Sequence, residues 1–385
     1  MCTDFMLPYR VNNPVVISGR TMDFSQSATK TFSTSLIKVP AGLSFSAIAP
    51  DLKAGHAWVN TYGFVGVCMT PDKSGAEPVS ASTDPVKSVY SDGLNTEGLS
   101  AAVLWLSYSD YEKPGDDPHC LDIESIIGYI LGTCADVNEV QKNLSGLTVW
   151  CPDKWEVLVP FHIAVHDASG NSMVLEFVGG NKVYYNNAIG VLTNGPTYDV
   201  HATNYYYSYN ALTSSDNAVD KYVQLAKDAS GRYNITWGSG YQYEVLSSGM
   251  AGLPGDSSSP SRFIRAAKLR QCVPDAYNAR EGAQYALQIL NRVEVCEREV
   301  LTYYKPDGAP EDPRNTYNPT LWKVIRDHSG KILYYCTLKN HNLQSVALDQ
   351  LDFSVGAPAC ALPMADDNWV VDCTAGLQCA APAGN

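Results

Sequence analysis

The chain contains no run of about eighteen apolar residues, the length that a helix needs to cross a bilayer, so the sequence predicts no membrane span. No charged segment followed by an apolar one, as in a signal peptide, precedes Cys2. Two localisations stay open: cytoplasmic as the sequence is written, or periplasmic if Met1 replaces a leader. Basic residues are scarce, with 27 Lys and Arg against 40 Asp and Glu and a net charge of -13. Nucleic acids and anionic membranes attract positive surfaces, so the sequence predicts neither as a partner.

Metal-binding signatures are also missing. The 385 residues include only 7 His and no Cys-x-x-Cys pair, whereas zinc sites use Cys and His at short spacing. We therefore expect no metal and no cofactor. Most of the cysteines after Cys2 lie in apolar runs, where a buried thiol acts as a small hydrophobic side chain. Cys373 and Cys379 are the best candidates for a disulfide, provided that the compartment is oxidising.

The chain does have enough apolar residues, 45% of the total, for a sizeable core. Stretches rich in β-branched and aromatic residues predict strands within 14–24, 56–69, 99–109, 161–196 and 321–338. Helical spacing occurs in two places, 123–144 and 259–295, the second with Ser259 as N-cap and Pro260 at the first helical position. Strands with helices grouped between them predict an α+β fold, in which helices cover the outer faces of the sheets. No signal marks a domain boundary.

Cys2 follows Met1 directly, and a small second residue allows an aminopeptidase to remove the initiating methionine. Cys2 would then carry a free α-amine with a pKa of about 8, low enough to act as a base near neutral pH. One residue would supply both a thiol nucleophile and a general base. A Met-Cys start also occurs by chance, so the motif needs further context.

Five blocks supply that context: MCTDF, SGRTMDF, SDGLNTEGLSAAVLWL, GVLTNGPTYDVH and GLPGDSSSPSRFIRA. In this order, from residue 2 to about residue 270, they resemble the choloylglycine hydrolase family, which contains conjugated bile acid hydrolases and penicillin V acylases. The resemblance implies a four-layer αββα sandwich of the N-terminal nucleophile hydrolase type, with the nucleophile at the start of a central strand. It also implies a single domain over residues 2–385, without Met1, and a homo-oligomer, by resemblance a tetramer.

The resemblance assigns roles residue by residue. Cys2 matches the nucleophile, Arg20 and Asp23 match the pair beside it, Asn194 matches the oxyanion-hole amide, and Arg262 matches the active-site arginine. Physically, an arginine favours a thiolate by its charge, and an amide is a neutral donor for a developing oxyanion. Simpler interpretations stay open: an ordinary ion pair at a strand end, an Asn-Gly turn, and a solvated residue in a first helical turn.

The chain departs from the family pattern at two places. Many bile-salt-type members have an asparagine where this chain has Trp105, and an indole cannot copy an amide's hydrogen bonds. Trp105 and Phe24 would instead offer an aromatic wall, which is more similar to the penicillin V acylases. The segment 201–240 is longer than its family equivalent, which often makes tetramer contacts, so the oligomeric state is in doubt.

The sequence therefore predicts an amidohydrolase that acts on linear N-acyl amides, most similar to a penicillin V acylase. A conjugated bile salt or an N-acyl homoserine lactone is the alternative substrate. A Cys–His protease lacks any local signature around an internal cysteine. A catalytically silent binding protein on the same fold is the non-enzyme alternative.

Overall fold

The computed structural model describes residues 1–8, 15–25, 32–50, 53–71, 88–115, 119–151, 160–212, 229–231, 234–237, 241–244, 249–250, 252–301, 317–364, 367 and 369–371. The tail cysteines Cys373 and Cys379 and most of the segment 213–240 lie outside the described residues, so the predicted disulfide and the predicted insertion both stay predictions.

The first of two large sheets carries the N-terminus and has six antiparallel strands in the order β14-β1-β2-β17-β18-β19. Their bounds in that order are Val191–Leu192, Cys2–Met6, Ile17–Asp23, Thr320–Asp327, Ile332–Thr337 and Gln344–Ala347. Strands from opposite ends of the chain, β2 and β17, are neighbours in this sheet. The N-terminal strand β1 therefore lies between β14 and β2 within the sheet, and its first residue, Cys2, lies at one end of the strand.

The second large sheet has eight antiparallel strands in the order β13-β12-β11-β8-β7-β6-β3-β20. Their bounds in that order are Asn181–Asn186, Ser172–Val178, Phe161–His166, Ser100–Trp105, Tyr90–Asn95, Phe64–Pro71, Phe32–Val39 and Cys360–Pro363. Three two-stranded sheets complete the described strands: β4–β5 (Ser44–Ile48, Ala54–Val59), β9–β10 (Cys120–Asp122, Thr148–Trp150) and β15–β16 (Asn234–Trp237, Tyr241–Glu244).

Strand β8 shows how the two sheets pack. Ala102 and Leu104 belong to a core that also contains residues of the first sheet, whereas Ala101 and Val103 belong to a second core on the opposite face. Successive residues of a strand point to opposite faces, so this alternation means that both faces of the eight-stranded sheet are buried. One face packs on the six-stranded sheet, and the other is closed by helices.

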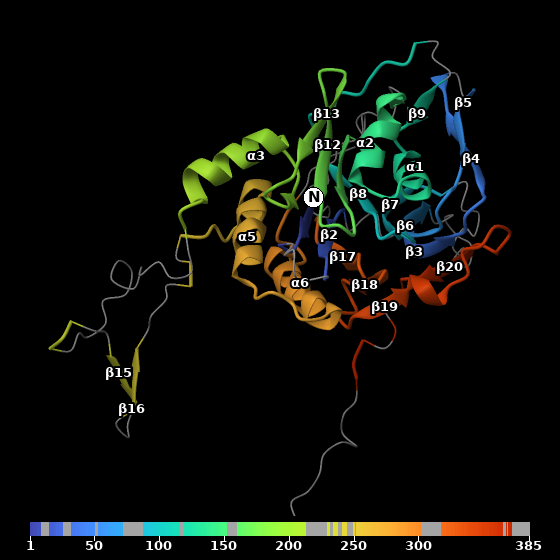
Figure 1. The fold of residues 1–385 in the computed structure, drawn as a ribbon. Helices are drawn as coiled ribbons and strands as arrows, with labels where there is room; N and C mark the ends of the chain where they lie inside the picture. The colour runs from blue at the N-terminus through green and yellow to red at the C-terminus, as the bar shows by residue number, and fades with distance from the viewer. Residues whose placement is uncertain are drawn as a thin grey trace, which may run out of the picture.

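Helices form the two outer layers. On the first sheet lie α5 (Ser259–Cys272) and α6 (Ala279–Val293), which add residues such as Phe263 and Leu290 to the core that contains both sheets. On the second sheet lie α1 (Ile126–Thr133) and α2 (Val137–Ser145), which add Ile130 and Leu144 to the second core. Figure 1 shows the two helix pairs on opposite sides of the strands. The predicted four-layer αββα sandwich is confirmed.

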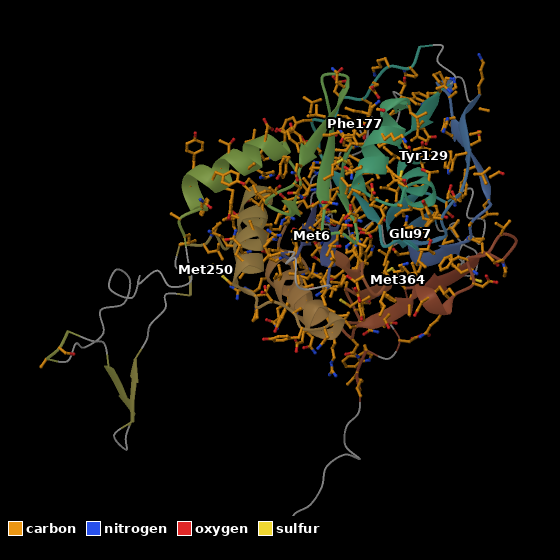
Figure 2. The ribbon with its side chains drawn as sticks, in the orientation of Figure 1. Met6, Glu97, Tyr129, Phe177, Met250 and Met364 are labelled. Atoms are coloured by element: carbon orange, nitrogen blue, oxygen red, sulfur yellow. The ribbon has the colours of Figure 1, made fainter. Side chains whose placement is uncertain are left out.

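The interior is filled by side chains, as Figure 2 shows. Met6 of β1 and Phe177 of β12, both labelled there, are almost inaccessible to solvent. Among the described residues, no helix is both long enough and apolar enough to cross a bilayer.

Two local predictions need correction. The helix expected to begin after Ser259 has Ser258 as its N-cap, so Pro260 is the second helical residue. The N–H groups of the first helical turn have no acceptor within the helix, so proline, which lacks an N–H, is tolerated there. Three consecutive serines, Ser257 to Ser259, are equivalent candidates for the N-cap, and the sequence does not distinguish among them. A third helical place, α3 (Tyr198–Asn204) followed by the π-helical turn Tyr205–Tyr209, was not predicted.

The prediction that most cysteines after Cys2 are buried is confirmed for Cys68, Cys120, Cys134, Cys151 and Cys336. It is wrong for Cys272, Cys296 and Cys360, which are exposed. These three lie at a helix end, after a helix and in an edge strand, positions where one side of the chain faces water even when the neighbouring sequence is apolar.

Candidate active site

The predicted site residues come together where β1 and β2 of the first sheet meet the end of β8, the turn after β14 and the start of α5. Cys2 is the first residue of β1 and pairs with Met22 of β2. Alternate residues of a strand share a face, so Arg20 and Met22 lie on the face of β2 that looks toward the second sheet, and Asp23 lies on the other face. Cys2 is buried, with 4% of its surface exposed.

Two side chains of β2 contact the Cys2 thiol. Arg20 Nη2 lies 3.7 Å from Cys2 Sγ, and Met22 Sδ lies 3.6 Å from it. The other contacts of Arg20 hold it in place: Nη2 donates to Val103 O at 2.5 Å, and Nη1 donates to Asp92 Oδ2 at 2.9 Å. Arg20 therefore holds a positive charge beside the Cys2 sulfur.

Arg20 and Asp23 are not paired with each other, so the simpler interpretation of an ion pair at a strand end is wrong. Asp23 is instead approached by Arg262 Nη1, at 3.5 Å from Oδ2, and accepts a hydrogen bond from Thr320 Oγ1 at 2.5 Å through Oδ1. Burial raises the pKa of Asp23, and the nearby Arg262 and the chain amine act in the opposite direction. The three-residue spacing puts the two side chains on opposite faces of β2.

The Cys2 nitrogen donates to Asn194 Oδ1 at 2.6 Å. Met1 precedes it in this chain, and its main-chain oxygen accepts from Asp23 N at 2.8 Å while its amine donates to Asp23 O. Burial lowers the pKa of the Met1 amine, and Asp23 is among the groups that raise it. The environment around this first peptide bond therefore disfavours a charged amine.

Asn194 lies in the turn after β14 and uses its side-chain amide in both directions. Oδ1 accepts from Cys2 N and, at 2.8 Å, from Arg262 Nη2. Nδ2 donates to Trp105 O at 2.9 Å, and an amide NH₂ has a second hydrogen. The chain also bends at residues 194–196, where the Gly195–Pro196 peptide bond is cis. The Asn-Gly turn thus coexists with contacts to the other site residues.

Arg262, in the first turn of α5, is completely buried, so the alternative of a solvated helix residue is wrong. Nη1 donates to Cys2 O and to Thr3 Oγ1, both at 2.6 Å, and Nε donates to Ser257 O at 3.0 Å. Desolvation lowers the pKa of Arg262, while Asp23 raises it. Arg262 therefore donates hydrogen bonds to both the Cys2 main-chain oxygen and the Asn194 side-chain amide oxygen.

Three further residues contact the site residues, and of these only Ser259 was named from the sequence, as a helix cap and not as a site residue. His201 Nε2 donates to Asn194 O at 2.8 Å, and Asn194 N donates to Ser259 Oγ at 2.9 Å. Burial lowers the pKa of His201 to about 4, so this imidazole is neutral near neutral pH. Thr320, on β17, is the third, through its bond to Asp23. No local pattern gives these residues a role in the site, although His201 and Ser259 stand inside two of the five family-like blocks.

The two aromatic residues expected near the thiol are both half-buried. The Trp105 ring packs edge-on against Phe161, with centroids 6.4 Å apart and planes at 79°. Phe24 packs against the core that contains both sheets. Within the described chain no group of three or more His, Cys, Asp or Glu side chains is placed to hold a metal ion.

The four-layer αββα sandwich with a cysteine at the start of a central strand is the arrangement that the resemblance in the sequence implies. The chain belongs to the choloylglycine hydrolase family of linear amide C–N hydrolases, whose model matches residues 2–368. The resemblance seen in the sequence is thereby confirmed.

Among curated relatives, the chain is 30% identical over 266 residues to a bile salt hydrolase/transferase of Lactiplantibacillus plantarum, covering 68% of this chain and 74% of that protein. It is 28% identical over 237 residues to a penicillin V acylase of Pectobacterium atrosepticum, covering 58% of each. Among solved structures, a variant of conjugated bile acid hydrolase from Clostridium perfringens superposes with a TM-score of 0.67 at 21% identity, covering 95% of this chain and 98% of the other. Penicillin V acylase from Agrobacterium tumefaciens gives 0.65 at 22% identity, covering 94% and 91%.

Proposed function

We propose that this protein hydrolyses N-acyl amides with Cys2 as its nucleophile, once Met1 has been removed. The observation that carries the proposal is how Cys2 is held: Asn194 Oδ1 binds its nitrogen, and Arg20 Nη2 faces its sulfur. Nucleophile and base reside in one residue, and each has its own partner, which is the arrangement that such chemistry requires.

The reaction would proceed through an acyl-enzyme. The freed α-amine of Cys2 takes the thiol proton, and the thiolate attacks the acyl carbonyl carbon. The second Nδ2 hydrogen of Asn194 and a backbone N–H stabilise the oxyanion. As the carbon–nitrogen bond breaks, the α-ammonium returns its proton to the leaving amine. Water, deprotonated by the same amine, then cleaves the thioester and releases the acid.

The two arginines and Asp23 would support these steps differently. Arg20 stabilises the thiolate by its charge. Arg262 and Asn194 hold the main chain of Cys2, so that the amine and thiol keep their relative position. Asp23 raises the pKa of the Met1 amine in the uncleaved chain, and in the mature protein it would in the same way stabilise the ammonium form of Cys2 that develops after proton transfer.

For the substrate, we propose an aryl-substituted acyl group such as the phenoxyacetyl group of penicillin V. Trp105 and Phe24 are half-buried aromatic residues expected to form a wall at the site, and an aromatic pair contributes about 0.5–1.5 kcal/mol beyond the area that it buries. The second candidate is a conjugated bile acid, which the 30% identity to a bile salt hydrolase/transferase favours. An N-acyl homoserine lactone substrate and a silent binding role remain alternatives, and the tetramer remains a prediction by resemblance.

Trapping the intermediate tests the proposal. The mature protein is mixed with penicillin V, glycine- or taurine-conjugated bile acid, or N-acyl homoserine lactone and quenched in acid, and its mass is measured. We expect an acyl adduct on the peptide that begins with Cys2, and the highest kcat/KM for penicillin V. Cys2→Ala should retain the fold, lack the adduct and lose turnover, and Cys2→Ser should be far slower than the wild type. Full turnover in Cys2→Ala would place the nucleophile elsewhere.

A further inference from the structure

A row of buried charged residues extends from Arg20 into the space between the two sheets. It comprises Asp92 of β7, Arg326 of β17, Asp4 of β1 and His166 of β11, each at most about 1% exposed. Four different strands supply these groups, so the row exists only in the packed sandwich. Such residues are expensive to bury and need compensation by partners of opposite charge.

Arg326 is the centre of this row. Its Nε donates to Asp92 Oδ1 at 2.8 Å, and its Nη2 donates to Asp92 Oδ2. Its Nη1 donates to Asp4 Oδ2 at 3.0 Å, and Asp4 Oδ1 in turn lies 2.5 Å from His166 Nε2. Burial by itself would lower the pKa of Arg326, but Asp92 and Asp4 raise it above its ordinary value. Arg326 is therefore a permanently charged partner of Asp92.

Asp92 binds both Arg20 and Arg326, and this affects the positive charge that Arg20 presents to the Cys2 thiol. Arg20 donates to the same Oδ2 at 2.9 Å, and its other hydrogen bonds to oxygen go to the main-chain carbonyls of Ser91 and Val103. A carboxylate bound only to Arg20 would cancel much of the positive charge that faces Cys2 Sγ. Because Arg326 binds both oxygens of Asp92, that cancellation is reduced.

We propose that Asp92 and Arg326 are positioning residues for Arg20: Asp92 orients its guanidinium, and Arg326 balances Asp92 so that the charge of Arg20 acts on the Cys2 sulfur. This inference rests on the proposed role of Cys2. The other charged groups around the thiol are Asp23 on β2, Arg262 on α5 and the chain amine. The titratable groups around Arg326 are Asp92, Asp4 with its partner His166, His328, whose imidazole is neutral, and Arg20.

Replacing Arg326 and replacing Asp92 should affect the pH midpoint for alkylation of Cys2 differently, which makes the proposal testable. In Arg326→Met, Asp92 binds Arg20 alone, so the Cys2 thiolate loses stabilisation. The pH midpoint for alkylation of Cys2 by iodoacetamide, followed by peptide mass mapping, should rise by about one unit, and kcat/KM at pH 6 should fall roughly tenfold. In Asp92→Asn, Arg20 keeps its full charge and its bonds to the Ser91 and Val103 carbonyls but loses the carboxylate that orients it. The midpoint should not rise, while kcat falls.

Lys323→Met is the matched control. Lys323 is a buried cation on the same strand as Arg326 but on the opposite face, where Nζ bonds to Asn291 Oδ1 and Glu294 Oε2 at 2.8 and 2.7 Å. It should lose stability without moving the alkylation midpoint. Arg326→Lys, which keeps the charge, should stay close to the wild-type midpoint.

An unchanged alkylation profile in Arg326→Met would reduce the row to a structural role and overturn the proposal. If Arg326→Met does not fold, Asp92→Asn decides, because an unchanged kcat there overturns it equally. Cys2→Ala separates this failure from failure of the proposed function: if Cys2→Ala keeps turnover, Cys2 is not the nucleophile, whatever Arg326 does.

Discussion

The side-chain amide of Asn194 donates a 2.9 Å hydrogen bond to the main-chain oxygen of Trp105. The bond joins the turn after β14 to the end of β8, and so connects the predicted oxyanion donor to the residue that departs from the family pattern. The contact uses the Trp105 backbone only. Replacing the Trp105 indole should therefore leave the Asn194 amide in place. A substitution at Trp105 would then change substrate selectivity without removing the oxyanion donor.

Asn194→Ala should lower kcat by roughly two to three orders of magnitude, which is the usual loss for one oxyanion donor, with a smaller change in KM. Steady-state kinetics on penicillin V measure this. Asn187→Ala is the control, because Asn187 is also a buried turn residue and its Oδ1 accepts from Gly190 N at 2.9 Å. It should cost stability and leave kcat intact. Lost affinity with unchanged kcat in Asn194→Ala would make Asn194 a binding residue.

Trp105→Ala should reduce kcat/KM for penicillin V more than for a conjugated bile acid, because the smaller aryl group depends more on one aromatic wall. The ratio of the two kcat/KM values is the measurement. Trp58→Ala removes a buried indole from β5, which is not among the elements that meet at the site, and should leave the ratio unchanged while lowering the melting temperature. An equal loss for both substrates in Trp105→Ala would contradict the aromatic-wall argument.

Removing every residue ahead of Cys2 should activate the protein. A tag joined to Cys2 through a protease site that leaves Cys2 first makes the comparison within one preparation. With any residue in front, the Cys2 nitrogen is an amide that cannot accept a proton, so turnover should rise by at least about a hundredfold on cleavage. Intact mass reports the N-terminus, and the same chain with Cys2→Ala is the control. Full turnover in the uncleaved protein would refute the role of the amine.

Stability should fall as the pH drops below about 6.5. Burial lowers the pKa of His328 to about 3, while an unfolded histidine titrates near 6.5. Between these values the unfolded state binds a proton that the folded state excludes, so the contribution is fully present above the window and is lost as pH decreases through it. By pH 5 this amounts to about 2 kcal/mol of unfolding free energy.

Urea unfolding of the wild type, His328→Gln and His341→Gln at pH 7.5 and 5 tests this. His328→Gln should show a weaker pH dependence, and His341→Gln, which changes an exposed residue, should match the wild type. Some dependence should remain in His328→Gln, because His201 titrates in the same window with its pKa lowered to about 4. An identical slope in all three proteins would show that His328 is not held neutral.

The sequence by itself determined the parts of the site that are local in the chain. A cysteine after Met1 holds a thiol and a prospective amine on one residue, and the block SGRTMDF indicated that Arg20 lies beside it. The contact of Met22 with the thiol was not predicted. Stretches rich in β-branched and aromatic residues likewise predicted strands of both large sheets, and helical spacing predicted α1, α2, α5 and α6. The order of the five blocks indicated the family.

Only the tertiary structure decided which distant groups meet. Asn194 reaches the Cys2 nitrogen across 192 residues of chain and Arg262 reaches the Cys2 oxygen across 260, because β14, β1 and α5 become neighbours only when the sheets and helices pack. The simpler interpretation of Arg20 and Asp23 as an ion pair is wrong, since Asp92 of another strand and Arg262 of α5, not the neighbour in sequence, supply the opposite charges. Arg326 shares Asp92 with Arg20 for the same reason: burial between two sheets forces charges from separate strands to compensate one another, and no local pattern in the sequence records that requirement.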